Sequence, residues 1–411
     1  DYDTINTIDN IQATKYLELV LNILVNFQRT TYFNHVNTLN QIRPILYTLY
    51  KLYKLSNKYN HIYIPLLDQF LLKDKYIFND ETEYIHYLEI IINNLPNILE
   101  EKIYNSLFTK ISIYPNKLKK YNTILQNHYI SSHQHIKPLM LLNVQKNKKN
   151  IGYISDSYSA ILFKYMKHIF NNHDYNKYNI FIYTFRTKLN VNNIHKDVHK
   201  DVHYKYLNNT SSKDIATIIK NDNIDILIDQ MQFTIHSKMD ILCYKPAKHI
   251  ISYLASPISS IYVDYIFLDK YLYNNQDYIK EKILYLPYGI HCYDTSVYPK
   301  INKKINIFTP VIRIGFTGCF FKMTDTMFNI INSVLDNNNN VILLIRNSKF
   351  KYLENKDLFL KNILPKHRHK INISTIYSDT NFYDIYNHID ILLDIYPYGG
   401  CTTIFDALYM N

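Results

Sequence analysis

Residues 390–408 read DILLDIYPYGGCTTIFDAL, and this stretch decides the fold. Its apolar start predicts a buried β-strand, Gly399 and Gly400 predict a tight turn, and the residues from Thr402 onward predict a helix. Two of the chain's six glycines lie in this turn, which indicates that the backbone requires them there. A strand that passes through a glycine turn into a helix is typical of a doubly wound α/β sheet.

Outward from this stretch, short apolar runs alternate with amphipathic segments as far back as residue 150. Such alternation predicts two Rossmann-like units with parallel sheets. We expect strands at 150–155, 178–184, 224–229, 248–254, 263–268 and 282–286, and then at 311–316, 341–346, 371–376 and 389–395. We expect helices at 160–171, 212–221, 325–335, 352–363 and 379–388, and a last one from Thr402. Ser211 and Asp214 have the spacing of a helix capping box.

Residues 1–145 have a different pattern, with apolar residues at helical spacing around 17–25, 45–52, 82–94 and 97–112. This predicts an all-helical region, compatible with degenerate repeats of the TPR type. The expected domains are therefore 1–145 (helical), 146–300 (first Rossmann-like unit) and 301–411 (second Rossmann-like unit). The chain stops about two turns into its last helix, so we expect the second unit to be incomplete.

Composition excludes few classes of function. The chain has 411 residues, is 47% hydrophobic and carries a net charge of +11, but its basic residues are scattered and no nucleic-acid-binding signature accompanies them. The most apolar stretch, 250–268, is interrupted by Pro257 and Asp264, and the start of the chain shows no leader pattern. The four cysteines form no CxxC pattern. We expect a cytoplasmic protein with no metal, no membrane segment and no nucleic-acid partner.

The glycine turn also has the chemistry of an anion site. N–H groups and the helix dipole favour an anion at the start of a helix. The hydroxyls of Thr402 and Thr403 add donors for a diphosphate, and Asp406, one turn on, could accept hydrogen bonds from ribose hydroxyls. An ordinary strand–turn–helix with threonine capping is the structural alternative.

These residues resemble a known family. YGGCTT at 398–403, followed by DALYM at 406–410, is similar to the segment of the O-GlcNAc transferase and SPINDLY family that binds the nucleotide diphosphate. GCFFKM at 318–323 resembles the family's Asn-x-x-x-Lys-Ile element, and IGYISD at 151–156 resembles its Gly-Tyr-Val/Ile-Ser-x-Asp element. The resemblance covers about residues 145–411 in order.

The resemblance implies a GT-B fold and an inverting, metal-independent glycosyltransferase without a cofactor. It implies transfer of a sugar, GlcNAc from UDP-GlcNAc by family majority, to Ser or Thr hydroxyls of acceptor proteins. GDP-fucose is an alternative donor, because the segment at Tyr398 is closer to SPINDLY. The implied catalytic residue is Lys322, and the implied donor-binding residues are Gly400, Cys401, Thr402, Thr403, Asp406, Tyr377 and Phe382.

The segment after the Ser-Asp pair departs from the family pattern. Members carry a His there, whereas residues 157–161 read SYSAI. The loss removes an imidazole that could act as acid or base. His168 could substitute, but its amphipathic helix favours an inert surface position. A catalytically inactive homologue that serves as a nucleotide-binding protein or scaffold therefore stays open as an alternative.

Overall fold

The computed structural model describes residues 81–93, 95, 101–156, 158, 160–185, 198–231, 237–254, 261–271, 279–296, 310–318, 322–346, 353–374 and 379–410. The chain divides into two compact units. Residues 89–300 form the first unit, and residues 1–88 together with 301–411 form the second. The helices expected around 17–25 and 45–52 lie outside the described residues.

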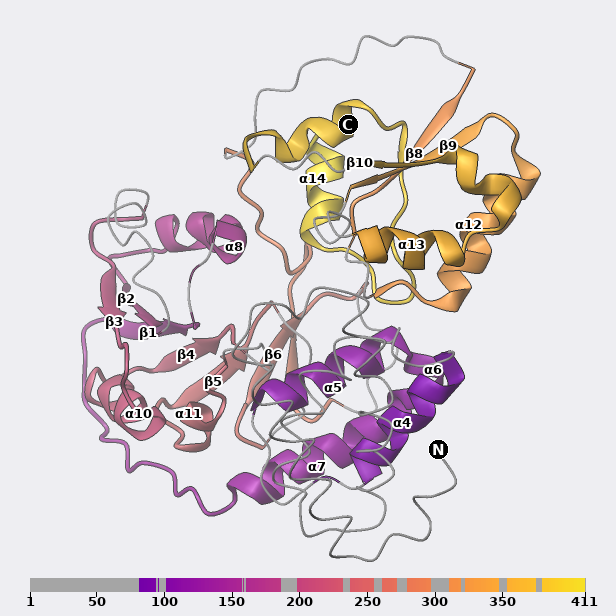
Figure 1. The fold of residues 1–411 in the computed structure, drawn as a ribbon. Helices are drawn as coiled ribbons and strands as arrows, with labels where there is room; N and C mark the ends of the chain where they lie inside the picture. Colours follow the sequence, from indigo (N-terminus) through magenta and orange to yellow (C-terminus); the bar gives the residue numbers. More distant parts are fainter. Residues whose placement is uncertain are drawn as a thin grey trace, which may run out of the picture. The chain divides into compact units, whose positions relative to one another are not determined.

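A seven-stranded sheet, entirely parallel, forms the centre of the first unit, in the order β3-β2-β1-β4-β5-β6-β7. Figure 1 shows helix α8 on one face of the sheet and α10 and α11 on the other. The predicted doubly wound sheet is therefore confirmed. The strands are β1 Lys149–Ile154, β2 Tyr178–Thr184, β3 His203–Tyr206, β4 Ile226–Asp229, β5 His249–Ser252, β6 Tyr265–Leu268 and β7 Lys282–Tyr285, and the helices are α8 Ala160–Asn171, α10 Ser212–Asn221 and α11 Asp240–Cys243.

Strand β1 lies at the point where the sheet reverses its order. It pairs with β2 on one side and with β4 on the other, and its residues 150–154 are all buried. A strand covered on both faces reads as a continuous apolar run, which is why the sequence showed it clearly. Gly152 allows close packing here, since a Cβ atom on it would lie 3.1 Å from the ring of Tyr183 and 3.2 Å from Leu227.

Helix α10 begins with the predicted capping box. The Ser211 hydroxyl accepts a hydrogen bond from the Asp214 backbone N–H and donates one to the Asp214 carboxylate. Ile215, Ala216 and Ile219 face the interior. The cap fixes where the helix starts, and the apolar stripe fixes which face meets the sheet.

The described part of the amino-terminal region is helical, as expected. Its elements are α4 Glu81–Asn93, α5 Glu101–Ile113, α6 Pro115–Leu118, the 3-10 helix η4 Lys119–Tyr121 and α7 Asn122–His133. Tyr104 and Tyr129 meet edge to face, with ring centroids 5.2 Å apart, in the core between α5 and α7. None of the helices in the described part of the chain is long and apolar enough to cross a membrane.

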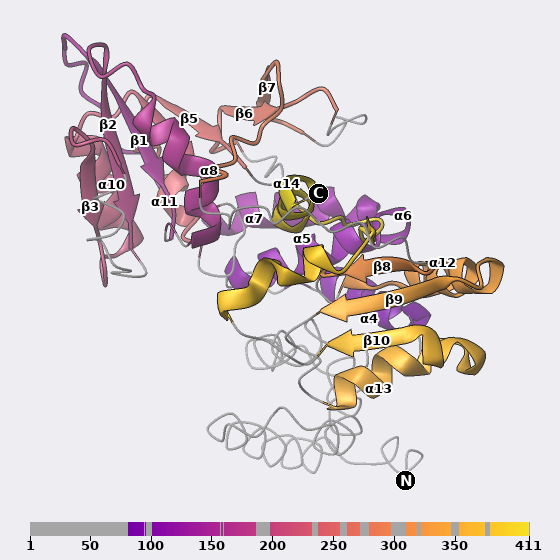
Figure 2. The same ribbon diagram turned by 90° about the horizontal axis from the view of Figure 1, so that it is seen from above.

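The second unit contains a four-stranded parallel sheet in the order β10-β9-β8-β11, so its strands follow the order with which the first sheet begins. Figure 2 shows β8, β9 and β10 running in the same direction. The strands are β8 Ile312–Phe316, β9 Val341–Arg346, β10 Ile371–Ser374 and β11 Ile391–Leu392, and the helices are α12 Asp325–Asn337, α13 Leu353–Lys361, η7 Pro365–Lys370, η8 Asp379–Asn387 and α14 Thr402–Met410.

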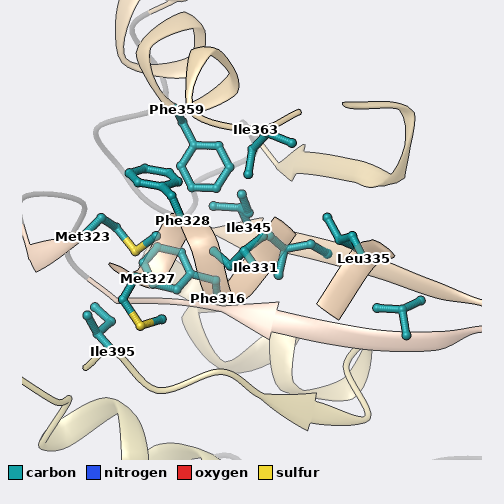
Figure 3. Packing of buried hydrophobic residues seen from close by; sticks show 12 residues of the cluster. Phe316, Met323, Met327, Phe328, Ile331, Leu335, Ile345, Phe359, Ile363 and Ile395 are labelled. Atoms are coloured by element: carbon teal, nitrogen blue, oxygen red, sulfur yellow. The ribbon is translucent and has the colours of Figure 1, made fainter. Parts of the chain in front are cut away.

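Both faces of this second sheet are covered. Figure 3 shows Phe328 of α12 and Phe359 of α13 over Phe316 of β8 and Ile345 of β9. The two phenylalanine rings meet at a centroid distance of 5.4 Å. On the opposite face, Leu344 of β9 packs against a cluster from η8 and α14. Successive residues of β9 thus face opposite layers, as strand geometry requires.

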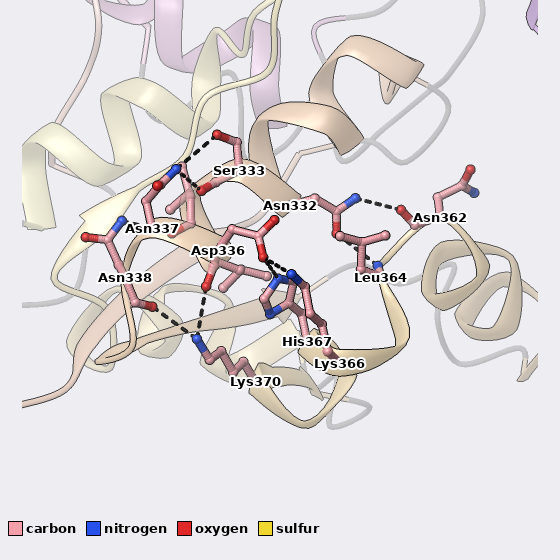
Figure 4. A network of polar contacts seen from close by, with 12 residues as sticks. Asn332, Ser333, Asp336, Asn337, Asn338, Asn362, Leu364, Lys366, His367 and Lys370 are labelled. Atoms are coloured by element: carbon pink, nitrogen blue, oxygen red, sulfur yellow. Dashed lines mark hydrogen bonds and ion pairs between the residues drawn. The ribbon is translucent and has the colours of Figure 1, made fainter.

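The carboxyl end of α12 is capped by side chains from η7 (Figure 4). Lys370 Nζ donates to the carbonyls of Leu335 and Asn338, each at 3.0 Å. His367 lies with Nε2 2.8 Å from the Asp336 carboxylate, which Lys366 also pairs with. Cations stabilise the negative end of a helix. Part of the chain's positive charge therefore has a structural role in this cap.

Several elements differ from the sequence expectations. Residues 379–388, expected as an α-helix, form the 3-10 helix η8, because Asp, Thr, Asn and Tyr are weak helix formers. The strand expected at 389–395 pairs with β8 only at Ile391 and Leu392. Strand β3, an edge strand that reads HYKY, was not predicted because it has no apolar run.

Candidate functional site

The glycine turn of the second unit, residues 393–401, joins β11 to α14. Strand β11 lies beside β8, on the side opposite to β9, so this is where the strand order of the sheet reverses. In open α/β sheets, ligands bind at the carboxyl ends of the strands at such a reversal. The turn therefore lies where a ligand is expected.

Lys322 reaches this turn from the segment that follows β8. Its Nζ donates a hydrogen bond of 3.1 Å to the carbonyl of Gly399 and lies 4.0 Å from the ring centroid of Tyr398. The side chain is half-buried. Residues 77 positions apart in sequence are thus brought together, and an ammonium group is held at the turn.

Asp394 closes the same turn, and the sequence analysis missed it as a site residue. Its Oδ1 accepts hydrogen bonds from the backbone N–H of Gly400 at 2.7 Å and of Ile395 at 2.8 Å. A Cβ atom on Gly399 would lie 2.9 Å from Asp394 Oδ2, and one on Gly400 would overlap with the hydroxyl of Thr403. A side chain at either glycine would therefore displace the Asp394 carboxylate or the Thr403 hydroxyl from its position in the turn. The only local signal for Asp394 was an acidic residue at the end of an apolar run.

Helix α14 begins directly after the turn. The carbonyl of Cys401 accepts the first helical hydrogen bonds, from the N–H groups of Ile404 and Phe405. Thr402 and Thr403 occupy the first turn of the helix and are half-buried, while Cys401 is exposed. Residues 399–403 therefore lie together at the positive end of a helix, the position that favours an anion.

Asp406 faces the interior, with only 1% of its surface exposed. Beside it, the Tyr386 hydroxyl donates a 3.3 Å hydrogen bond to the carbonyl of Thr403. Burial, together with the nearby Asp406 carboxylate, raises the pKa of Tyr386 to about 12. A contact between Asp406 and a ribose would require the carboxylate to be reached from solvent, whereas here it lies on the buried face of α14.

Two further residues, Tyr377 and Phe382, were predicted to bind the donor nucleotide. Tyr377 lies outside the described residues, and Phe382 lies in η8 with its side chain outside the described part. Both assignments stay predictions.

At the first sheet, the region where the family carries a His is occupied by Tyr158. This side chain is buried, and its hydroxyl donates a 2.6 Å hydrogen bond to Gln230 Oε1. Gln230 follows β4, and its Nε2 lies 2.7 Å from the sulfur of Met166. Burial raises the pKa of the Tyr158 hydroxyl well above its ordinary value, so the group stays protonated. Polar groups that follow β1 and β4 thus bond to one another.

His168 is bound to a different part of the first unit. Its Nε2 lies 3.2 Å from the Asp294 carboxylate, which is 1% exposed and also pairs with Lys167 at 3.4 Å. Ser296 donates two further hydrogen bonds of 2.9 Å to the same carboxylate. Burial would raise the pKa of Asp294, but these bonds and charges outweigh it and lower the pKa. His168 therefore holds residues 294–296 against α8 in this structure.

No group of three or more His, Cys, Asp or Glu side chains within the described ranges is arranged to hold a metal ion. The candidate site combines a lysine, backbone N–H groups and hydroxyls, which suit a phosphate ligand, with the carboxylate of Asp394.

Part of the chain is similar to a known family of proteins. Residues 116–315 match the model of glycosyl transferase family 41. The matched range contains β1 to β7 and ends before Lys322 and the glycine turn. The resemblance to the O-GlcNAc transferase and SPINDLY family predicted from the sequence is confirmed.

The similar proteins include probable plant transferases. The chain is 24% identical over 278 residues to a probable UDP-N-acetylglucosamine–peptide N-acetylglucosaminyltransferase SPINDLY of Hordeum vulgare, with 64% of this chain and 29% of the relative covered. It is 28% identical over 160 residues to the Arabidopsis thaliana protein SEC, which has the same descriptive name, with 38% of this chain and 16% of the relative covered. The chain thus spans less than a third of the length of these curated relatives.

Among solved structures, an O-GlcNAc transferase mutant from Thermobaculum terrenum has a similar fold. Its TM-score is 0.60 at 14% sequence identity, and the match covers 97% of this chain and 81% of the other. The similarity extends over both units and confirms the predicted GT-B-like architecture. The match to TPR repeats in the amino-terminal region stays a prediction.

Proposed function

We propose that this chain is a glycosyltransferase that binds a nucleotide sugar at the glycine turn of its second unit. The observation that carries the proposal is the match of residues 116–315 to glycosyl transferase family 41. The relatives are described as probable UDP-N-acetylglucosamine–peptide N-acetylglucosaminyltransferases. We extend this to the present chain as transfer of GlcNAc from UDP-GlcNAc to Ser or Thr hydroxyls of proteins, with inversion and without a metal ion.

Lys322 has the chemistry that such a reaction needs. Negative charge develops on the nucleotide diphosphate as the glycosidic bond breaks, and an ammonium group beside it stabilises that charge. Lys322 already lies at the turn, where Gly399 and Tyr398 hold its Nζ. Thr402, Thr403 and the start of α14 would bind the phosphate oxygens.

One observation favours a second candidate function, a homologue that binds the nucleotide but does not transfer sugar. Near the segment where the family carries a His, Tyr158 is buried and bonded to Gln230. Its hydroxyl does not face solvent and cannot act as a base for an acceptor while it is so held. A GDP-sugar donor, as implied for SPINDLY-like members, is tested in the same experiments.

The first experiment is a calorimetric titration of UDP and of GDP into the full chain and its Lys322→Ala variant. We expect one nucleotide to bind, and the loss of a charged hydrogen bond to weaken it about 10- to 100-fold. Lys366→Ala is the matched control, because Lys366 pairs with Asp336 at the cap of α12. Absence of binding of either nucleotide to a folded wild-type chain would refute the proposal.

A second experiment separates transfer from binding. Release of UDP from UDP-GlcNAc is measured with and without a Ser/Thr-rich acceptor peptide, and GDP-fucose is tested in parallel. Acceptor-dependent release that Lys322→Ala abolishes supports the transferase. Tight nucleotide binding without any release, with either donor and a range of acceptors, supports the inactive homologue instead.

A further inference from the structure

Asp394 places a negative charge in the turn that is proposed to bind a diphosphate. Its carboxylate is exposed, and its Oδ1 accepts the N–H of Gly400 at 2.7 Å. Gly400 lies two residues before the first residue of α14, at the positive end of the helix. A backbone N–H in this position is the kind of donor that anion sites use. In the structure, that donor is already engaged by an acidic side chain of the same chain.

The carboxylate also takes up space beside the turn. A Cβ atom added to Gly399 would lie 2.9 Å from Asp394 Oδ2, and one added to Gly400 would lie 3.2 Å from Asp394 Oδ1. The carboxylate thus fills the room beside Gly399 and shares the room beside Gly400 with the Thr403 hydroxyl, which lies closer. A phosphate oxygen could approach the Gly400 N–H only if Asp394 moves or shares the hydrogen bond.

The cation of the turn is held in a comparable way. Lys322 Nζ donates to the carbonyl of Gly399, next to the residue whose N–H donates to Asp394. A carbonyl is a weaker partner for an ammonium than a phosphate is, so this contact can be exchanged for a ligand. An ionised carboxylate, by contrast, is a strong acceptor and repels an incoming anion.

We propose that Asp394 is an internal competitor of the donor diphosphate: its carboxylate holds the Gly400 N–H in the unliganded protein and opposes the binding of highly charged nucleotides. The inference rests on the proposed function, since it assigns a role within the same nucleotide site. Asp394 is a specificity-determining residue in this interpretation, and Lys322 remains the group that stabilises the leaving diphosphate.

The competition should discriminate between donor and product. The terminal phosphate of a free nucleoside diphosphate has one substituent, and its second ionisation lies near pH 6, whereas both phosphates of a nucleotide sugar have two substituents and one ionisable oxygen each. The product therefore carries about one more negative charge than the donor at neutral pH. Repulsion by Asp394 weakens the binding of the product more than the binding of the donor. It therefore favours release of the product after transfer.

The test compares UDP and UDP-GlcNAc binding to the full wild-type chain and to Asp394→Asn. The amide keeps an oxygen that can accept the Gly400 N–H but removes the charge. We expect UDP to bind about tenfold more tightly to Asp394→Asn, and UDP-GlcNAc only about threefold more tightly, from the difference in charge. GDP and GDP-fucose replace these ligands if the titrations identify GDP as the nucleotide.

Asp357→Asn is the matched control, since Asp357 is an exposed carboxylate on α13 and its removal changes the net charge equally. The control should leave both affinities within about twofold. If Asp394→Asn binds UDP no more tightly than the wild type does, or more weakly, the inference is overturned and Asp394 serves only to stabilise the turn. If neither protein binds any of the four ligands while both are folded, the proposed function itself fails, and this inference fails with it.

Discussion

The two sheets begin with the same strand order, but the connections at their switch points differ. In the first unit, the residues after β1 and β4 are joined by a buried pair, Tyr158 and Gln230, at 2.6 Å. In the second unit, the turn between β11 and α14 is held by contacts to the backbone of Gly399 and Gly400. One connection is fixed by packed side chains, and the other by groups that a ligand could take over.

This difference shows which groups are available for chemistry. A hydrogen bond between buried side chains is coupled to packing, so breaking it lowers stability. A bond from a half-buried lysine or an exposed carboxylate to a backbone group can be exchanged at small cost. We therefore expect substitutions in the first connection to change stability and substitutions in the second to change ligand affinity.

The largest expected effect comes from Tyr158→Ala. Removing a buried ring leaves a cavity against Phe170 and a buried Gln230 without its donor, which should lower the free energy of unfolding of the first unit by about 3–5 kcal/mol. Chemical denaturation monitored by circular dichroism measures this. Tyr288→Ala is the control, because Tyr288 is 99% exposed and its loss should change stability by less than about 0.5 kcal/mol. Equal stability of the two variants would contradict the comparison.

Gly400→Ala should change ligand affinity more than stability, in contrast to Tyr158→Ala. The added Cβ displaces the Thr403 hydroxyl and crowds Asp394, so we expect affinity for the bound nucleotide to fall about 30-fold, or about 2 kcal/mol. Stability should fall by less than about 1 kcal/mol, because the turn lies at the surface. The measurements are a nucleotide titration and thermal unfolding of the same preparation.

Gly152→Ala is its counterpart in the first sheet. Here the added Cβ meets Tyr183, Leu227 and Ile224 at 3.1–3.3 Å, so overpacking should lower stability by about 1–3 kcal/mol. Nucleotide affinity of the folded variant should stay the same. An affinity loss in Gly152→Ala equal to that in Gly400→Ala would show that the two connections do not differ as proposed.

Much of this architecture could be predicted from the sequence because the elements have local signals. The bounds of β2, β9, α8 and α10 agree with the expected ranges, since apolar runs end at polar residues or at a cap such as Ser211. Where the signal is weak, the prediction was wrong: η8 is a 3-10 helix, and β11 is only two residues long.

The candidate site was less accessible to prediction, because its contacts join distant residues. The link between Lys322 and Gly399 spans 77 positions, and only the family resemblance indicated it. Helical spacing placed Asp406 one turn into α14 but could not show that this face is buried. No pattern indicates which N–H a strand-terminal aspartate accepts, so Asp394 was missed.

The same comparison can be made with two carboxylates, buried Asp294 in the first unit and exposed Asp394 in the second, by measuring the stability of Asp294→Asn and Asp394→Asn. Because Asp294 has a lowered pKa in the folded state, its contribution to stability is present above the unfolded pKa of about 4 and is lost as pH falls through the folded value. Asp294→Asn should therefore lower stability by about 1–2 kcal/mol at pH 7, and the difference from wild type should shrink towards pH 3. Asp394→Asn should leave stability within about 0.5 kcal/mol at both pH values. Denaturation curves at the two pH values test this.

The smallest expected effect concerns the tyrosine beneath the second turn. Tyr386 donates a 3.3 Å hydrogen bond to the Thr403 carbonyl, which as part of α14 also has a helical N–H as a partner. Tyr386→Phe should thus cost less than about 0.5 kcal/mol. Tyr158→Phe, which leaves a buried Gln230 oxygen without its 2.6 Å donor, should cost about 1–3 kcal/mol. Parallel denaturation of the two variants measures the contrast, and a larger loss for Tyr386→Phe would mean that the second turn, too, depends on buried side-chain hydrogen bonds.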